Sequence, residues 1–152
     1  MIDCKFKLNG KPLSFFQCGA TNFPAFSGLG PHVNKREAMC IPDWGPIPPG
    51  SYYIFDRETG GLRGLWPRIF DEHSDWFALY AIDKKIDDET YCNKVRRGEF
   101  RLHPVGPRRI SKGCITINSQ SDFQFLRTIL KKTKQEPVPG SKLLAYGKVV
   151  VT

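Results

Sequence analysis

The sequence lacks several patterns that would assign it to a common class. Its five cysteines form no C-x-x-C pair, which argues against a zinc ribbon or a dithiol redox motif. No stretch approaches the ~20 apolar residues that a membrane-spanning helix needs. No pattern of interleaved aromatic and basic residues indicates an RNA-binding module. We therefore expect no metal, no cofactor, no membrane span and no nucleic-acid partner.

The start of the chain also lacks the continuous apolar segment of a secretory signal, because Met1 to Leu8 alternate between polar and apolar side chains. We expect the protein to be made in the cytoplasm and to leave, if it leaves, by a route that reads no cleavable signal. Acidic residues are outnumbered, with Lys+Arg 23 against Asp+Glu 15 and a net charge of +8. This charge suits an acidic partner such as an anionic membrane or a carboxylate-rich cell-wall polymer.

The 152 residues predict one domain over residues 1–152, large enough to bury a core. Gly 14, Pro 12 and 12% aromatic residues favour a β-rich chain joined by turns. Apolar patterns predict a hairpin over 3–16 around Asn9-Gly10, strands over 51–56, 76–82, 99–103 and 114–117, and a strand pair over 142–151. Residues 17–50 and 57–75 are predicted as loops, and the charged residues 83–97 as a solvated segment with room for a short helix.

One segment has helical periodicity, residues 121–134. Ser121 followed by Gln124 fits a capping box, and lysines at the carboxyl end suit the helix dipole. The predicted fold is therefore mainly β, a sandwich or barrel with one packing helix near the C-terminus.

The stretch with the clearest chemistry is residues 99–117. It predicts a strand ending in His103, a Pro/Gly-rich loop, and a turn Ser111-Lys112-Gly113-Cys114 that enters another strand. Paired strands lie ~4.8 Å apart, so the cysteine can return beside the histidine. A thiolate is the nucleophile in cysteine catalysis, and a neighbouring imidazole can take the thiol proton. Backbone N–H groups at Gly113 and Cys114 could face an oxyanion, and Ser111 could hold that turn.

The alternative is structural. Cys114 would then be a small buried apolar residue, and His103 a hydrogen-bonded residue at a strand end. The odd number of cysteines leaves at least one free thiol, for which Cys114 is our candidate. The other cysteines could pair in an oxidising compartment, but spacing alone gives no connectivity; they are Cys4, Cys18, Cys40 and Cys92.

The order of a histidine, a loop and the turn Ser-x-Gly-Cys strongly resembles the catalytic motif of L,D-transpeptidases. These enzymes remodel peptidoglycan stem peptides on a β-rich fold. Further segments narrow the resemblance to a family of L,D-transpeptidase-like type VI secretion effectors, toxins delivered into the periplasm of a rival bacterium. These segments are Pro24-Ala25-Phe26-Ser27-Gly28, residues 45–54, Asp56-Arg57-Glu58-Thr59-Gly60-Gly61, Trp76-Phe77-Ala78-Leu79-Tyr80 and Gly113-Cys114-Ile115-Thr116-Ile117.

The resemblance implies that Cys114 attacks the carbonyl of the third stem residue while His103 takes its proton. The terminal D-alanine leaves, and water or a D-amino acid resolves the thioester. It also implies a cognate immunity protein and a secretion-apparatus partner. Two departures from typical members are Lys112 before Gly113 and Thr116 where an arginine is common. They favour L,D-carboxypeptidase trimming or D-amino-acid exchange over cross-linking.

Three arginines beside this turn, Arg101, Arg108 and Arg109, could bind stem-peptide carboxylates or form a solvated basic face. Two other functions stay open. One is a non-catalytic module that binds the cell wall or another polyanion. The other is a cysteine-dependent amidase of the same polymer, with Cys18 preceding His32 or His73.

Overall fold

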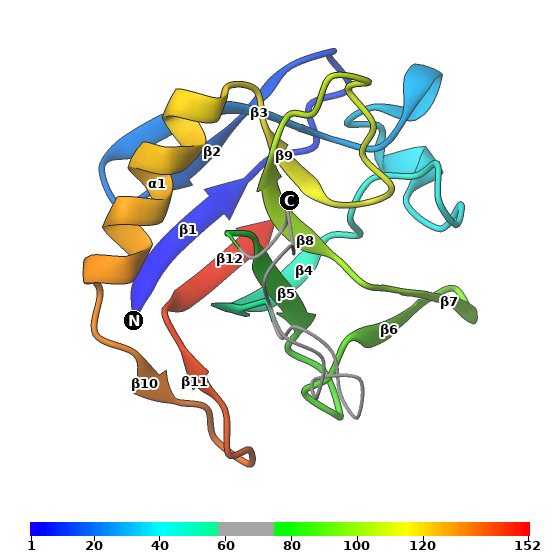
Figure 1. Ribbon diagram of the computed structural model, residues 1–152. Coiled ribbons are helices and arrows are strands. Elements are labelled where there is room, and N and C mark those ends of the chain that lie inside the picture. Colours follow the sequence, from blue (N-terminus) through cyan, green and yellow to red (C-terminus); the bar gives the residue numbers. More distant parts are fainter. Residues whose placement is uncertain (58–74) are drawn as a thin grey trace, which may run out of the picture.

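The computed structural model describes residues 1–57 and 75–152 and has a closed β-barrel at its centre (Figure 1). Eight strands hydrogen-bond in a ring, in the order β1 (Ile2–Phe6), β12 (Gly147–Val151), β4 (Gly50–Asp56), β5 (Phe77–Ala81), β8 (Arg101–Pro104), β9 (Ile115–Ile117), β3 (Thr21–Ser27) and β2 (Ser14–Cys18). The prediction of a mainly β barrel is thereby confirmed. The prediction of one domain over 1–152 stays a prediction.

Two of the eight strand pairs are parallel, β1 with β12 and β8 with β9. In the β8–β9 pair Leu102 lies opposite Ile115, and His103 lies opposite Thr116. Leu102, Ile115 and Ile117 have no exposed surface and belong to the barrel core. Because side chains alternate along a strand, His103 and Thr116 lie on the outer face of the barrel.

One α-helix, α1 (Gln120–Lys132), is present in the described part of the chain and packs on the barrel. Its buried face, Phe123, Leu126 and Leu130, joins the same apolar cluster as the inward strand residues. The bounds of the helix differ from the predicted segment 121–134 by one residue at its start and two at its end. The predicted cap was wrong, because the hydroxyl of Ser119, not of Ser121, accepts the N–H of Asp122.

Three segments differ from the sequence predictions. Residues 17–50, predicted as loops and turns, contain the barrel strand β3 as well as the short 3-10 helices η1 (Gly30–His32) and η2 (Arg36–Ala38). Residues 83–97 contain no helix; they hold β6 (Glu89–Cys92) and the start of β7 (Val95–Gly98). The two residues between β6 and β7, Asn93 and Lys94, have positive φ, as tight hairpins require.

The predicted strand pair over 142–151 is also wrong in its pairing. Residues of β11 (Leu144–Ala145) pair with β10 (Glu136–Pro137), whereas β12 pairs with β1 and β4. The predicted hairpin over 3–16 is present as β1 and β2, but its connection is longer than the two-residue Asn9-Gly10 turn. The predicted loop 57–75 falls largely outside the described residues.

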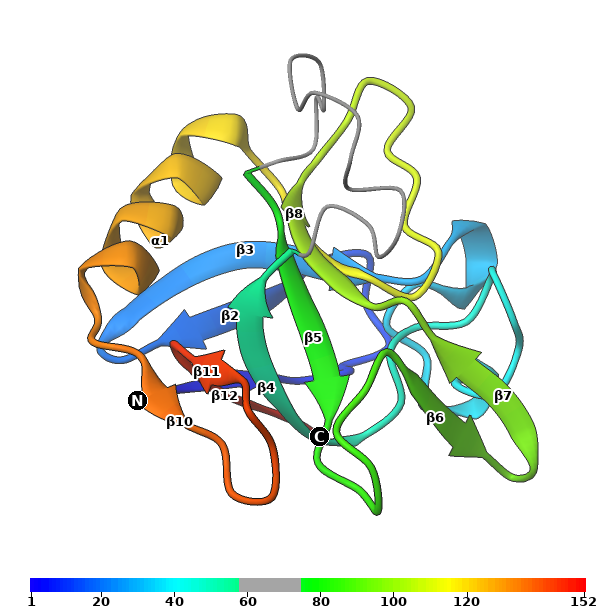
Figure 2. The same ribbon diagram turned by 60° about the horizontal axis from the view of Figure 1, so that its bottom comes forward.

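A disulfide joins Cys40 to Cys92, so the segment after η2 is tied to the β6–β7 hairpin. That hairpin and α1 lie on opposite sides of the barrel (Figure 2). Cys4 and Cys18 are buried thiols opposite each other on β1 and β2, and Cys114 is a third free thiol. No helix among the described residues is long and apolar enough to cross a membrane.

Candidate active site

His103 lies on β8, and Cys114 directly precedes β9, the strand that pairs with β8. His103 is opposite Thr116 in the register of the two strands. Cys114 precedes Thr116 by two positions, so the same register places Cys114 opposite Arg101 and on the face that carries Thr116. The imidazole and the thiol are therefore diagonal neighbours across strands ~4.8 Å apart. The register thus places the two residues of the predicted site two positions apart along the β8–β9 pair.

The His103 ring has a defined orientation. Its Nδ1 lies 2.8 Å from the carbonyl oxygen of Pro104, and a carbonyl can only accept, so this hydrogen bond assigns the proton to Nδ1. Nε2, 3.3 Å from the hydroxyl of Thr116, is then the accepting nitrogen. The indole of Trp76 stacks on the imidazole with ring centroids 4.3 Å apart and planes at 19°. These contacts leave His103 only 5% exposed.

The thiol of Cys114 is protonated at neutral pH. Burial raises the pKa of Cys114 to about 11, although a backbone hydrogen bond from Arg101 and the positive charge of Arg101 act in the opposite direction. The carboxylates of Asp88 and Glu99 add to the increase in the pKa. The resting site therefore holds a thiol rather than a thiolate.

The peptide that leads into Cys114 is held by two buried serines. The hydroxyl of Ser111 donates to the carbonyl oxygen of Cys114 at 2.8 Å. The hydroxyl of Ser27, at the end of β3, accepts the N–H of Ile47 at 2.8 Å and donates to the carbonyl oxygen of Gly113 at 3.4 Å. Both carbonyls flanking the thiol are thus oriented by hydroxyl groups.

Gly113 is required where it stands. Its φ is +89°, a region that other residues rarely adopt. A Cβ added there would lie 2.7 Å from a guanidinium nitrogen of Arg97 and 3.0 Å from the ring of Phe100. Arg97 cannot move aside easily, because its guanidinium is buried over the Phe100 ring and donates to the carbonyl oxygens of residues 39, 45 and 46.

The three arginines predicted to bind substrate lie in different environments. Arg101 forms a two-pronged ion pair with Asp88, with N–O distances of 2.7 and 2.5 Å. Arg108 is exposed. Arg109 lies over the ring of Phe26 at 5.4 Å and donates to the side chain of Asn118 at 2.9 Å. Substrate binding by Arg101 would thus compete with its ion pair.

A cavity of about 400 Å³ opens beside the thiol. Its charged lining is mixed in sign and comprises Asp43, Arg96, Arg97, Glu99 and Lys112. Within the described ranges, no group of three or more His, Cys, Asp or Glu residues could hold a metal ion. The nucleophilic group that lines this cavity is the thiol of Cys114.

Sequence reasoning did not find the residues that support this pair. Ser27 and Trp76 stood inside the quoted motifs, but nothing in the sequence showed that one orients the Gly113 peptide and the other stacks on His103. Thr116 stood out only as a departure from the common pattern. The roles of Asp88 and Arg97 depend on contacts between distant segments, and no sequence pattern marked them.

Comparison with models of protein families shows which family the chain belongs to. The sequence model of the Tlde1 domain matches residues 21–141, which include β3, the His103–Cys114 loop and α1. The chain belongs to the Tlde1 domain family. This is a family of type VI secretion effectors, which fits delivery to a target cell. Neither the comparison with curated proteins nor that with solved structures gave a match.

Proposed function

We propose that this Tlde1-domain protein is an antibacterial toxin that acts on the tetrapeptide stems of peptidoglycan by cysteine acyl transfer. The observation that carries the proposal is the diagonal placement of His103 on β8 and of Cys114 directly before β9, with the imidazole proton on Nδ1. That tautomer leaves Nε2 to accept a proton. Family membership supports the role of effector.

In the proposed reaction, Nε2 of His103 takes the Cys114 proton as the sulfur attacks the carbonyl carbon of the third stem residue. The tetrahedral intermediate collapses, and the C–N bond to the terminal D-alanine breaks. The departing amine receives the proton from His103, and the third residue remains as a thioester. Water then releases a tripeptide, or the amine of a free D-amino acid restores a tetrapeptide, and either restores the thiol.

The backbone supplies the oxyanion stabilisation in this scheme. The positive φ of Gly113 and the hydroxyl contacts to the Gly113 and Cys114 carbonyls fix the turn, so its N–H groups can be preorganised for a developing charge. One such donor contributes about 3–4 kcal/mol to transition-state stabilisation in enzymes where a donor was removed.

Trimming or exchange fits this site better than cross-linking. Thr116, at the position where arginine is common in L,D-transpeptidases, is fully buried and contacts His103. Position 116 therefore offers no charge to a second stem peptide. We further propose that the substrate lies in the periplasm of the target cell and that a cognate immunity protein and a secretion component bind this chain.

The test is mass spectrometry of disaccharide tetrapeptide incubated with purified protein, with and without a free D-amino acid. We expect tripeptide or exchanged tetrapeptide from the wild type and from His32→Asn, a control histidine on η1, and none from Cys114→Ala or His103→Ala. Product from Cys114→Ala at the wild-type rate would refute the mechanism. Directing the protein to the periplasm or the cytoplasm of a bacterial host tests the compartment, with growth arrest expected only from the periplasmic form.

The alternatives have distinct outcomes. A non-catalytic wall-binding module, which the charge of +8 favours, would bind sacculi in a salt-sensitive way, unchanged by Cys114→Ala, and release no product. An amidase that uses Cys18 has no support in the geometry, since Cys18 is buried inside the barrel opposite Cys4. His73, one of its partner histidines, lies outside the described residues.

A further inference from the structure

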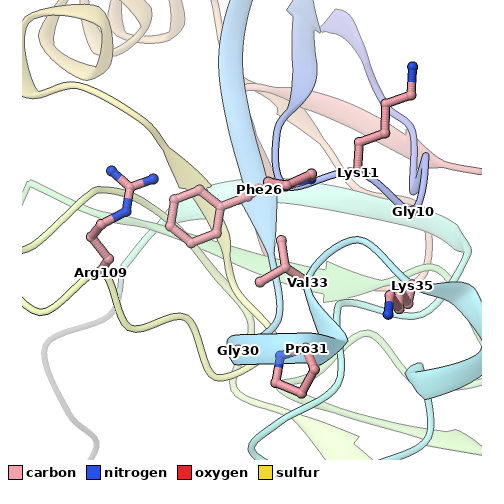
Figure 3. Close-up of a pocket in the computed structure, with 9 residues that line it drawn as sticks. Gly10, Lys11, Phe26, Gly30, Pro31, Val33, Lys35 and Arg109 are labelled. Atoms are coloured by element: carbon pink, nitrogen blue, oxygen red, sulfur yellow. The ribbon is translucent and has the colours of Figure 1, made fainter.

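A second cavity, of about 510 Å³, does not include the thiol among its lining residues but is lined by Arg109 of the β8–β9 loop (Figure 3). Four separate parts of the chain line it: the loop after β1, Phe26 on β3, residues 30–35 around η1, and the β8–β9 loop. We call it the cationic pocket and define it by six of its residues: Lys11, Phe26, Pro31, Val33, Lys35 and Arg109.

The charges of the cationic pocket have one sign. Lys11, Lys35 and Arg109 line it, and none of its lining residues is acidic. In the described part of the chain none of these three cations forms an ion pair, whereas Arg101 and Arg96 nearer the thiol are both paired with carboxylates. Three unpaired cations around one cavity attract an anion.

The floor of the pocket is apolar. In Figure 3 the ring of Phe26 and the side chain of Val33 lie between Arg109 and Lys35. Arg109 is held over the Phe26 ring and by Asn118, which uses only part of its five N–H donors. An apolar floor rimmed by cations suits a ligand that carries both an alkyl or peptide segment and carboxylates, rather than a bare inorganic anion.

A buried amide fixes the frame of the pocket. Asn34 has no exposed surface, and its side chain accepts the N–H of Ser27 and donates to the carbonyl oxygen of Lys11, each at 2.9 Å. Its own carbonyl accepts the N–H of Gly10 at 2.8 Å. The loop that carries Lys11 is therefore attached to the end of β3, so less ordering is needed when a ligand binds.

The pocket is within reach of the thiol and imidazole for a ligand of modest length. Phe26 pairs with Thr116 across β3 and β9, and Thr116 pairs with His103 across β9 and β8. Two strand spacings place Phe26 about 10 Å from His103. An extended tetrapeptide covers about 13 Å, so one stem peptide can contact both places.

We propose that the cationic pocket binds the carboxylate-bearing part of a peptide or amino acid that reacts at Cys114. This inference rests on the proposed function and adds a binding site to it. The carboxylates can belong to the stem peptide under attack or to the free D-amino acid that resolves the thioester. Both present the same chemistry to Lys11, Lys35 and Arg109.

The experiment compares the double variant Lys11→Glu/Lys35→Glu with the control Lys132→Glu/Lys134→Glu, which makes the same charge change beyond the cationic pocket, at the end of α1 and just after it. Disaccharide tetrapeptide and free D-methionine are varied in turn. We expect the pocket variant to raise the KM of one of them about five- to tenfold, with kcat within about twofold, and about 0.5 M salt to remove most of the difference. The substrate whose KM rises identifies the source of the carboxylate.

Binding of tetrapeptide to Cys114→Ala protein, with and without the two lysine changes, gives a second measurement that needs no turnover. Equal KM values for the pocket and control variants, with cleavage still dependent on Cys114, would overturn the cationic pocket and leave the proposed function intact. Absence of any cleavage by the wild type would instead refute the proposed function. The pocket would then depend on the binding measurement, and equal affinity of the two proteins would overturn it as well. Thermal melts establish that both double variants are folded.

Discussion

The ionisation of Cys114 gives the sharpest test of the site. Burial raises the pKa of this thiol from its ordinary value of 9.0 to about 11. At pH 7 about one molecule in 10⁴ then carries the thiolate, against about one in 100 for an ordinary thiol. Alkylation by iodoacetamide requires the thiolate. We therefore expect Cys114 to react about 100-fold more slowly at pH 7 than a solvent-exposed cysteine.

The assay is mass-spectrometric mapping of alkylated peptides over pH 6 to 11. The rate at Cys114 is expected to rise through the whole range without a plateau below about pH 10, while Cys4 and Cys18, buried in the barrel, serve as unreactive internal controls. A plateau below pH 8 would show a preformed thiolate and refute the reasoning that His103 removes the proton during attack. The raised pKa of Cys114 also makes the free energy of unfolding depend on pH. Its contribution to stability is fully present below about pH 9 and is lost as the pH rises from about 9 to 11.

Three further predictions concern stability, and denaturant unfolding measures each. Gly113→Ala is expected to lower the free energy of unfolding by about 2–4 kcal/mol, because φ is positive there and the new Cβ would contact rigid neighbours. Gly106→Ala in the same loop is the control. A Cβ at Gly106 meets nothing within 4 Å, so this change should lower it by less than about 1 kcal/mol. Replacing Cys40 and Cys92 by serine should cost about 2–4 kcal/mol, because the bond spans 52 residues, and a reductant should then have no further effect. Ser119→Ala should cost about 1 kcal/mol through loss of the helix cap.

The barrel was predictable where apolar residues form uninterrupted runs, and β3 shows why other strands were missed. Pro24 in the middle of β3 breaks the strand pattern. Its carbonyl oxygen accepts the N–H of Asn118, which lies just past the end of β9. The last residue pair between β3 and β9 is Ala25 with Ile117, so Pro24 faces a position outside β9. A donor at position 24 would face Asn118, so its absence removes no hydrogen bond from the three residue pairs that join β3 to β9. This tolerance depends on where β9 ends, which local sequence does not encode.

The site shows the same division between local and long-range information. The turn from Ser111 to Cys114 is contiguous, so spacing alone suggested a thiol next to a preorganised peptide. The contacts that orient the turn and His103 come from distant segments. Ser27 on β3 donates to the carbonyl of Gly113, and Trp76 before β5 stacks on His103. Arg97 donates to a carbonyl of the segment that the disulfide holds. The connectivity of Cys40 and Cys92 was likewise beyond sequence spacing, because four cysteines besides Cys114 allowed several pairings.

The geometry also bears on how the proposed nucleophile becomes active. A thiol with a pKa of about 11 and an imidazole whose Nε2 contacts Thr116 do not form a resting thiolate–imidazolium pair. In the proposed mechanism the proton must therefore move as the sulfur approaches the carbonyl, and the contact between Thr116 and Nε2 must weaken as Nε2 accepts it. Thr116→Val removes that hydroxyl while keeping the shape of the side chain. If the contact only restrains the base, this variant should keep kcat within about threefold. If the hydroxyl relays the proton, kcat should fall by about 10²-fold or more, the range of general acid–base contributions.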